Sequence, residues 1–211
     1  MKTITHLCLI RHGETPWNVE RRLQGHLDIP LNETGLSQAE QVAEHLPDLP
    51  YTALYASDLT RTRQTAAPLA KKTGLLPIVT SRLRERHYGI LQGLNPEEML
   101  SQYPEETAHY DARTPSFDAV NGESLQSLHD RITVLMDRLA KQHRGEYIIL
   151  VTHGGVLDIV HRWINQQPLD TQREFPIPNA AYNWISHNDE DGWKIEAWAD
   201  RSHLANTLDE L

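Results

Sequence analysis

Two histidines in the sequence, His12 and His153, stand in matching contexts that favour chemistry at one shared site. Each follows an apolar run typical of a buried β-strand, and each is followed directly by glycine. In open α/β sheets ligands bind beyond the carboxyl ends of the strands, and glycine lets a ligand approach the backbone N–H groups there. A single histidine in such a place is most often structural. Two of them predict one site, provided that the two strands are neighbours.

Arginines near these histidines indicate that the ligand is an anion. Arg11 directly precedes His12, and a second cation is available at Arg61 or Arg63, at the start of a predicted helix. The chain carries 20 basic and 29 acidic residues, a net charge of -9, so an anion must be held by a local cluster of cations. Planar guanidinium groups match phosphate oxygens in pairs. The pattern therefore predicts a phosphate site.

Four segments resemble the signature motifs of the histidine phosphatase superfamily, which includes the cofactor-dependent phosphoglycerate mutases. They occur in the family's order and extend from residue 5 to about residue 165. They are Leu9-Ile10-Arg11-His12-Gly13-Glu14-Thr15 with Trp17-Asn18, then Ser57-Asp58-Leu59-Thr60-Arg61, then Leu83-Arg84-Glu85, and finally Val151-Thr152-His153-Gly154-Gly155. The resemblance places the phosphate arginine at Arg61.

The resemblance implies a covalent mechanism in which His12 attacks phosphorus and becomes a phosphohistidine. It implies that Arg11, Arg61 and His153 hold the phosphoryl oxygens. It also implies that Glu85 gives a proton to the leaving alcohol and later takes one from water. The two arginines should keep His12 unprotonated, because neighbouring positive charge disfavours the imidazolium. They should also lower the pKa of Glu85, whereas a general acid needs a raised pKa, so burial or the substrate dianion must offset them.

Further candidates for binding the substrate follow from the same resemblance. They are Asn18, Gln24, Gly25 and Gly154, of which the turn at residues 24–25 would offer backbone N–H groups. Glu14 is expected to orient its loop and to take no part in the chemistry. No metal and no other cofactor is expected, because the twelve histidines show neither an H-E-x-x-H spacing nor a His/Cys cluster.

The segment after Glu85 carries features of both a mutase and a phosphatase. The runs Arg86-His87-Tyr88-Gly89 and Gly93-Leu94-Asn95 resemble the mutase form of the third motif. Pro96, however, stands where mutases have lysine, the mutases' adjacent arginine pair is missing from the middle segment, and Gly155 stands in place of their asparagine. A mutase must hold a second anionic group and keep water from the phosphohistidine, and losing those cations weakens both requirements.

These departures, together with Asn121-Gly122-Glu123-Ser124, which resembles the phosphatase branch, predict a phosphomonoester hydrolase for small phosphorylated metabolites. The alternative is a cofactor-dependent phosphoglycerate mutase. A noncatalytic phosphate-binding module is a third option, against which the retention of the whole catalytic set argues. Arg86, Tyr88 and Arg113 could give a preference for phosphorylated acids, so Arg86 and Tyr88 are further substrate-binding candidates.

The apolar periodicity predicts an α/β fold, a three-layer αβα sandwich with a mostly parallel central sheet and helices on both faces. Strands are expected at residues 3–10, 53–56, 76–79 and 147–152, with a closing hairpin at 182–186 and 193–198. One helix is expected to run to residue 45, with Ser37 as N-cap and Glu40 in the capping box. Others are expected at 59–72, 124–143 and 156–164.

Length and composition predict one domain over residues 1–211 and exclude disordered and disulfide-rich classes, since 39% of residues are apolar and 23% charged. Cys8 is the single cysteine, which excludes an internal disulfide and favours a reducing compartment. No run approaches the ~20 apolar residues of a membrane span, so a cytoplasmic location is expected.

The acidic balance disfavours nucleic acid and anionic membranes as partners, leaving a small phosphorylated substrate. Aromatic residues cluster in the last third of the chain and are typical of core or dimer contacts, so a homodimer is also considered. These residues are Trp163, Trp184, Trp193 and Trp198.

Overall fold

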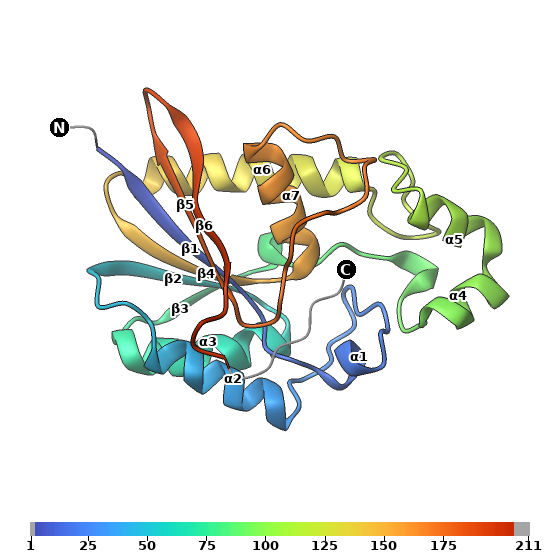
Figure 1. Ribbon diagram of the computed structural model, residues 1–211, viewed down its shortest axis with the longest axis horizontal. Coiled ribbons are helices and arrows are strands. Elements are labelled where there is room, and N and C mark those ends of the chain that lie inside the picture. The colour runs from blue at the N-terminus through green and yellow to red at the C-terminus, as the bar shows by residue number, and fades with distance from the viewer. Residues whose placement is uncertain (1–2, 205–211) are drawn as a thin grey trace.

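The computed structural model describes residues 3–204 and shows a six-stranded sheet between two layers of helices (Figure 1). The strand order is β3-β2-β4-β1-β5-β6. The strands are β1 (Thr5–Arg11), β2 (Tyr51–Ser57), β3 (Pro77–Thr80), β4 (Tyr147–Thr152), β5 (Tyr182–Asn188) and β6 (Gly192–Asp200). The first four run parallel to one another, β5 pairs antiparallel to β1, and β6 pairs antiparallel to β5. The predicted three-layer, mostly parallel sandwich is confirmed.

The helices fall into three groups. Helices α2 (Glu33–Glu44) and α3 (Thr60–Thr73) cover one face of the sheet, and α6 (Leu125–Gln142) and α7 (Gly154–Ile164) cover the other (Figure 1). The short helices α4 (Pro96–Gln102) and α5 (Pro104–Asp111) lie to one side of both layers (Figure 1). The remaining short elements are α1 (Pro16–Val19), η1 (Ser81–Leu83) and η2 (Gly89–Leu91).

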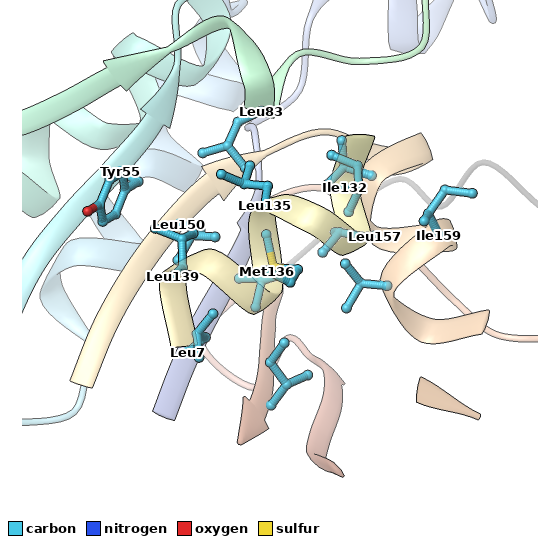
Figure 2. Packing of buried hydrophobic residues seen from close by; sticks show 14 of the residues in the cluster. Leu7, Tyr55, Leu83, Ile132, Leu135, Met136, Leu139, Leu150, Leu157 and Ile159 are labelled. Atoms are coloured by element: carbon cyan, nitrogen blue, oxygen red, sulfur yellow. The ribbon is translucent and has the colours of Figure 1, made fainter. Parts of the chain in front are cut away.

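Alternation along the central strands divides the core into two halves. Leu7 and Leu9 of β1 pack on the side of α6 and α7, while Cys8 and Ile10 pack on the side of α2 and α3. Side chains on successive strand residues point to opposite faces, so a strand covered on both faces is apolar throughout. Figure 2 shows the first half, where α6 packs against β1 and β4. Each fully buried Leu or Ile there contributes about 2 kcal/mol relative to exposure.

Helix α6 follows the predicted apolar stripe. Its buried residues recur at helical spacing and include Leu128, Ile132, Leu135 and Leu139. Ser124 caps its N-terminus by accepting a hydrogen bond from the Ser127 amide. Three of the four tryptophans of the last third pack beside this half of the core and Trp184 beside the other, which accounts for them as core contacts.

The prediction for the start of α2 is wrong by five residues. The helix begins at Glu33, and Asn32, in place of Ser37, is its N-cap, with its side chain accepting a hydrogen bond from the Gly35 amide at 2.8 Å. Gly35 lies within the first turn of α2. A side chain there would clash, because its Cβ would stand 2.0 Å from the Glu14 carbonyl oxygen. The missing side chain thus lets the helix start lie against the loop that carries His12.

Helix α7 likewise begins earlier than the predicted residue 156. Gly154 and Gly155 form its first turn, and His153 is the N-cap. Glycine is a weak helix former, so the sequence pattern favoured a loop here. A Cβ at residue 155 would lie 2.2 Å from Oε1 of Glu85, which shows that the glycine is required by a close contact with that carboxyl group.

Candidate active site

The two histidine loops meet because β1 and β4 are neighbours. Arg11 pairs with Thr152 across the two strands, so the next residue on each strand is a histidine. The His12 amide continues the ladder to the Thr152 carbonyl at 2.9 Å. The rings of His12 and His153 lie edge to face, with centroids 5.3 Å apart. The spatial neighbourhood expected from the sequence is therefore present. We call the side chains of Arg11, His12, Arg61, Glu85 and His153 the anion cup.

The tautomer of His12 follows from its hydrogen bond. Its Nδ1 lies 2.8 Å from the Gly13 carbonyl oxygen. A carbonyl only accepts, so Nδ1 carries the proton and Nε2 keeps its lone pair in the neutral ring. The pKa of His12 is held well below 6.5 by burial first, and then by the positive charges of Arg61 and Arg11. His12 is thus a neutral imidazole with an unprotonated Nε2.

Arg61 is the second cation of the cup, because it is buried whereas Arg63 is exposed. The Arg61 guanidinium donates to the carbonyls of Gly25 at 2.7 Å and Leu27 at 2.9 Å, and its Nε donates to Nδ1 of His153 at 3.3 Å. Burial lowers the pKa of Arg61 to about 10, so it remains charged at neutral pH. Among the described residues, two of its five N–H groups are left for a ligand.

His153 completes this side of the cup as a donor. Because its Nδ1 accepts from Arg61, its ring proton sits on Nε2. This Nε2 is buried and has no hydrogen-bond partner within residues 3–204. Burial and the neighbouring cations hold the pKa of His153 well below 6.5. A buried N–H group without an acceptor is costly and suits a site that takes up a ligand oxygen.

Arg11 is almost fully buried at the end of β1 and donates to the Ile177 carbonyl at 2.6 Å. Gly154 lies against its guanidinium, where a Cβ would be 3.6 Å from Nε of Arg11, an ordinary contact distance. The charge of Arg11 acts on His12, His153 and Glu85 alike. This places the guanidinium close to His12, His153 and Glu85, the neighbourhood that the sequence predicted for it.

Glu85 lies opposite the first turn of α7. Its Oε2 accepts from the Gly155 amide at 2.9 Å, and its Oε1 accepts from the Arg86 amide at 2.7 Å. Burial raises the pKa of Glu85 above 4.5, although these amides and the charges of Arg61 and Arg11 oppose the shift. The conflict between arginines and a general acid is therefore resolved by burial, which keeps the carboxyl group protonated to higher pH.

Of the other substrate-binding candidates, Asn18 has a structural partner, whereas Oε1 of Gln24 is buried with no hydrogen-bond partner within residues 3–204. Asn18 accepts from the Thr15 amide at 3.0 Å in the capping box of α1. Gln24 is buried, and Gly25, at a φ of +51°, turns its carbonyl toward Arg61. The sequence predicted that this turn offers N–H groups, whereas it meets the cup through the Gly25 carbonyl, which accepts from Arg61. Glu14 accepts from the Asn32 side chain at 2.7 Å, which fits the expected orienting role.

Arg86 and Tyr88 stand where the cup meets residues 94–123, which we call the cap segment. Arg86 donates to the carbonyls of Phe117 at 2.8 Å and Glu123 at 2.7 Å, and its guanidinium lies 5.7 Å from the Tyr88 ring. Arg113, by contrast, pairs with Asp158 of α7. Arg86, the residue after Glu85, is therefore bonded to the cap segment, while the charge of Arg113 is paired with the Asp158 carboxylate.

Several residues that support the cup were missed from the sequence. Thr65 accepts from the Gly13 amide at 3.0 Å, Asn179 donates to the His12 carbonyl at 2.9 Å, and His26 donates to the Glu85 carbonyl at 2.8 Å. Asn179 lies in a loop with no regular structure, and Thr65 lies inside a helix, so neither carried a pattern. Only the hydrogen bonds reveal their roles.

Among the described residues, no group of three or more His, Cys, Asp or Glu side chains is placed to bind a metal ion. Within residues 3–204, no helix has the length and apolar character needed to cross a bilayer.

Comparisons with known proteins match most of the chain. The model of the histidine phosphatase superfamily, branch 1, matches residues 7–201. Phosphoglycerate mutase-like protein 4 of Arabidopsis thaliana is 40% identical over 204 residues, covering 95% of this chain and 87% of the relative. A metal-independent phosphoserine phosphatase of the same plant is 39% identical, covering 96% and 84%. The solved structure of Bacillus stearothermophilus YhfR superposes with a TM-score of 0.86 at 32% identity, covering 94% and 98%.

Proposed function

The chain belongs to the histidine phosphatase superfamily, branch 1, and we propose that it hydrolyses phosphomonoesters of small metabolites through a phosphohistidine on His12. One observation carries the proposal. The lone pair of His12 Nε2 and the buried donor of His153 share one cup with Arg61, and a carboxyl group with a raised pKa stands beside it.

In the first step, the Nε2 lone pair of His12 forms a bond to phosphorus as the bond from phosphorus to the ester oxygen breaks. The departing oxygen takes the proton of Glu85, so an alcohol leaves and a carboxylate remains. The raised pKa of Glu85 supports this role, because it extends to higher pH the range in which the carboxyl group carries the proton that it must give.

In the second step, water attacks the phosphorus of the phosphohistidine. The Glu85 carboxylate takes a proton from the water, the N–P bond breaks, and its electron pair returns to Nε2 of His12. Inorganic phosphate leaves, and both side chains recover their starting protonation states. The Gly13 carbonyl holds Nδ1–H of His12 in both steps and stabilises the positive charge of the phosphorylated ring.

The charge on the transferring group is met by donors already in place. Arg61 offers its two remaining N–H groups and His153 its Nε2–H, while Arg11 supplies a further positive charge. Preorganised donors in a dry site supply most of the catalysis in phosphoryl transfer. All three side chains are buried and fixed by backbone carbonyls or by each other, so little reorganisation accompanies the reaction.

The second candidate is phosphoglycerate mutase activity, which the name of the phosphoglycerate mutase-like relative suggests for that protein. Two observations favour hydrolysis. Pro96 is the first residue of α4 and cannot supply the cation that mutases have there. Arg113 is engaged by Asp158 and by the Leu169 carbonyl. The name of the phosphoserine phosphatase relative supports a phosphorylated acid as substrate.

A substrate panel tests the proposal. It contains p-nitrophenyl phosphate, phosphoserine, glycerol phosphates, and 3-phosphoglycerate with and without 2,3-bisphosphoglycerate, with phosphate and 2-phosphoglycerate measured separately. The proposal expects phosphate release from several monoesters that disappears in His12→Asn. Isomerisation that depends on the bisphosphate and exceeds phosphate release would establish the mutase reading instead.

A further inference from the structure

Arg131, on α6, binds the main chain that leads to the proposed acid, although it lies outside the anion cup. Its Nη1 donates to the carbonyls of Arg82 at 2.6 Å and Arg84 at 3.1 Å, and its Nη2 donates to the Glu85 carbonyl at 3.4 Å. The Arg131 guanidinium thus donates hydrogen bonds to three carbonyl groups within residues 82–85. That segment carries Glu85 at its end.

Glu123 fixes the orientation of this guanidinium. Its two carboxylate oxygens accept from Nε and Nη2 of Arg131, both at 2.9 Å. Such a paired contact sets the plane of the guanidinium as well as its distance. Side-chain exposures of 22% for Arg131 and 17% for Glu123 show that the pair is largely shielded from water, which limits screening.

The main chain of Glu123 holds the residues that follow the acid. Its carbonyl accepts from Nε of Arg86 at 2.7 Å, and its amide donates to the His87 carbonyl at 2.7 Å. Arg131 and Glu123 together therefore form hydrogen bonds to the residues before and after Glu85. Among the described residues, the hydrogen bonds to the carboxyl group itself come from two amides, those of Gly155 and Arg86, so its place beside α7 depends on where this backbone lies.

We propose that Arg131 and Glu123 act as positioning residues that set the Glu85 carboxyl group for proton transfer, an inference that rests on the proposed function. Proton transfer needs the acid within hydrogen-bond reach of the leaving oxygen, and an error of about 1 Å can cost on the order of a hundredfold in rate. Removing the Arg131 fork would take away its three hydrogen bonds to the 82–85 main chain. The bonds of Thr152 to the Leu83 carbonyl and of His26 to the Glu85 carbonyl would remain, as would every side chain of the anion cup.

The leaving group provides a readout that a purely structural role would not move. p-Nitrophenolate departs without a proton, whereas the alkoxide of glycerol phosphate needs one. We compare kcat/KM for the two substrates, because this ratio covers the steps up to departure of the alcohol. Arg131→Met is expected to lower kcat/KM for glycerol phosphate by about 30-fold or more and for p-nitrophenyl phosphate by at most about 3-fold.

The matched control is Arg138→Met, since Arg138 is an exposed arginine on the same helix. It should change neither value by more than about twofold. Glu123→Gln keeps the main-chain bonds to Arg86 and His87 but removes the ion pair, so it should shift the two substrates in the same unequal way. Combining Arg131→Met with Glu123→Gln should lower kcat/KM no further than the more damaging of the two single variants, because both substitutions remove the same ion pair.

Equal losses on both substrates, or no loss with either variant, would overturn the inference. If Arg131→Met does not fold, as judged by its melting transition, Arg131→Lys and Glu123→Gln decide the question. Glu85→Gln separates this inference from the proposed function. If it shows the unequal loss and the Arg131 and Glu123 variants do not, only the positioning role fails. If Glu85→Gln also lacks it, the proposed acid fails and the inference with it.

Discussion

The anion cup and the cap segment both place arginines against oxygen atoms, but in different settings. In the cup, Arg11 ends a central strand and Arg61 lies in the first turn of a helix, and both are fully or almost fully buried. The two short helices of the cap segment lie at a small cluster of buried residues, made of Met99 and Ala119 from the segment and Leu91 from η2 just before it. Arg22 reaches Glu98 from outside the segment, with a quarter to a third of each side chain exposed.

This difference indicates which region must keep its geometry, the anion cup, and which region can change, the cap segment. The sheet register sets the cup, since a shift of β1 against β4 would part the two histidines and expose the apolar core. Few core contacts set the cap segment, so changes there cost less of the fold. Chemistry should therefore depend on the cup, and the choice of substrate on the cap segment. The predictions below test that division.

The largest effect is expected for His12→Asn, which removes the nucleophile and keeps a polar side chain of similar size. Activity on every substrate should fall on the order of 10⁴-fold or more. His109→Asn is the control, because His109 is an exposed histidine of the cap segment and should change activity by no more than about threefold. Steady-state assays with two substrates measure both. Comparable losses of activity in the two variants would contradict the claim that the chemistry depends on the cup and not on the cap segment.

Glu85→Gln should remove the alkaline limb of the pH profile. The protonated acid is the active form in the first step, so kcat/KM for an alkyl phosphate should fall as pH rises through the raised pKa of Glu85. Neutral His12 is lost only as pH falls through its lowered pKa, which lies well below 6.5. Glu85→Gln should cost about 10²- to 10³-fold near neutral pH.

The ratio of wild-type to Glu85→Gln kcat/KM, measured across pH, cancels ionisation of the substrate. The account expects this ratio to decline with rising pH. A ratio that is flat across pH would show that the limb belongs to another group.

Gly155→Ala should reduce activity by about 10- to 100-fold, because its Cβ would overlap Oε1 of Glu85 at 2.2 Å and displace the acid. The adjacent Gly154→Ala provides the comparison, since its Cβ would lie at an ordinary 3.6 Å from Arg11 and should cost only a few-fold. Both are measured on glycerol phosphate and p-nitrophenyl phosphate. Equal losses at the two positions would contradict the close contact as the cause.

The smallest effect is expected at the edge of the cap segment. Arg86→Met should lower kcat/KM for 3-phosphoglycerate relative to glycerol phosphate by about tenfold, because it removes a buried cation next to Glu85. The rate with p-nitrophenyl phosphate should change by at most about threefold. An unchanged ranking of substrates would leave the cap segment without a role in specificity through this residue.

The sequence predicted the cup well for a physical reason. Strand β4 was placed at its observed bounds, and His12 and His153 were expected to meet, because buried parallel strands are continuous apolar runs and end at one edge. The choice between Arg61 and Arg63 needed the family resemblance, since both lie near the start of one helix. The structure resolves it through burial.

The sequence did not predict the features that depend on contacts distant in the chain. Ser37 satisfied a capping rule as well as Asn32 did, and only the structure shows that Asn32 caps the helix and that Gly35, a weak helix former, stands in its first turn because of the close contact with Glu14. Arg131 lies in a helix whose apolar stripe explained its pattern, so its bonds to residues 82–85 carried no local signal. Helices α4 and α5 were likewise not predicted in the cap segment.

Trapping the covalent intermediate tests the central claim most directly. Glu85→Gln is mixed with ³²P-labelled p-nitrophenyl phosphate and quenched, since this variant should form the phosphohistidine readily with a good leaving group but hydrolyse it slowly. The account predicts up to one label per chain, stable in base, labile in acid, and located on His12. Label on another residue, or turnover by the wild type with no labelled protein at any quench time, would contradict it.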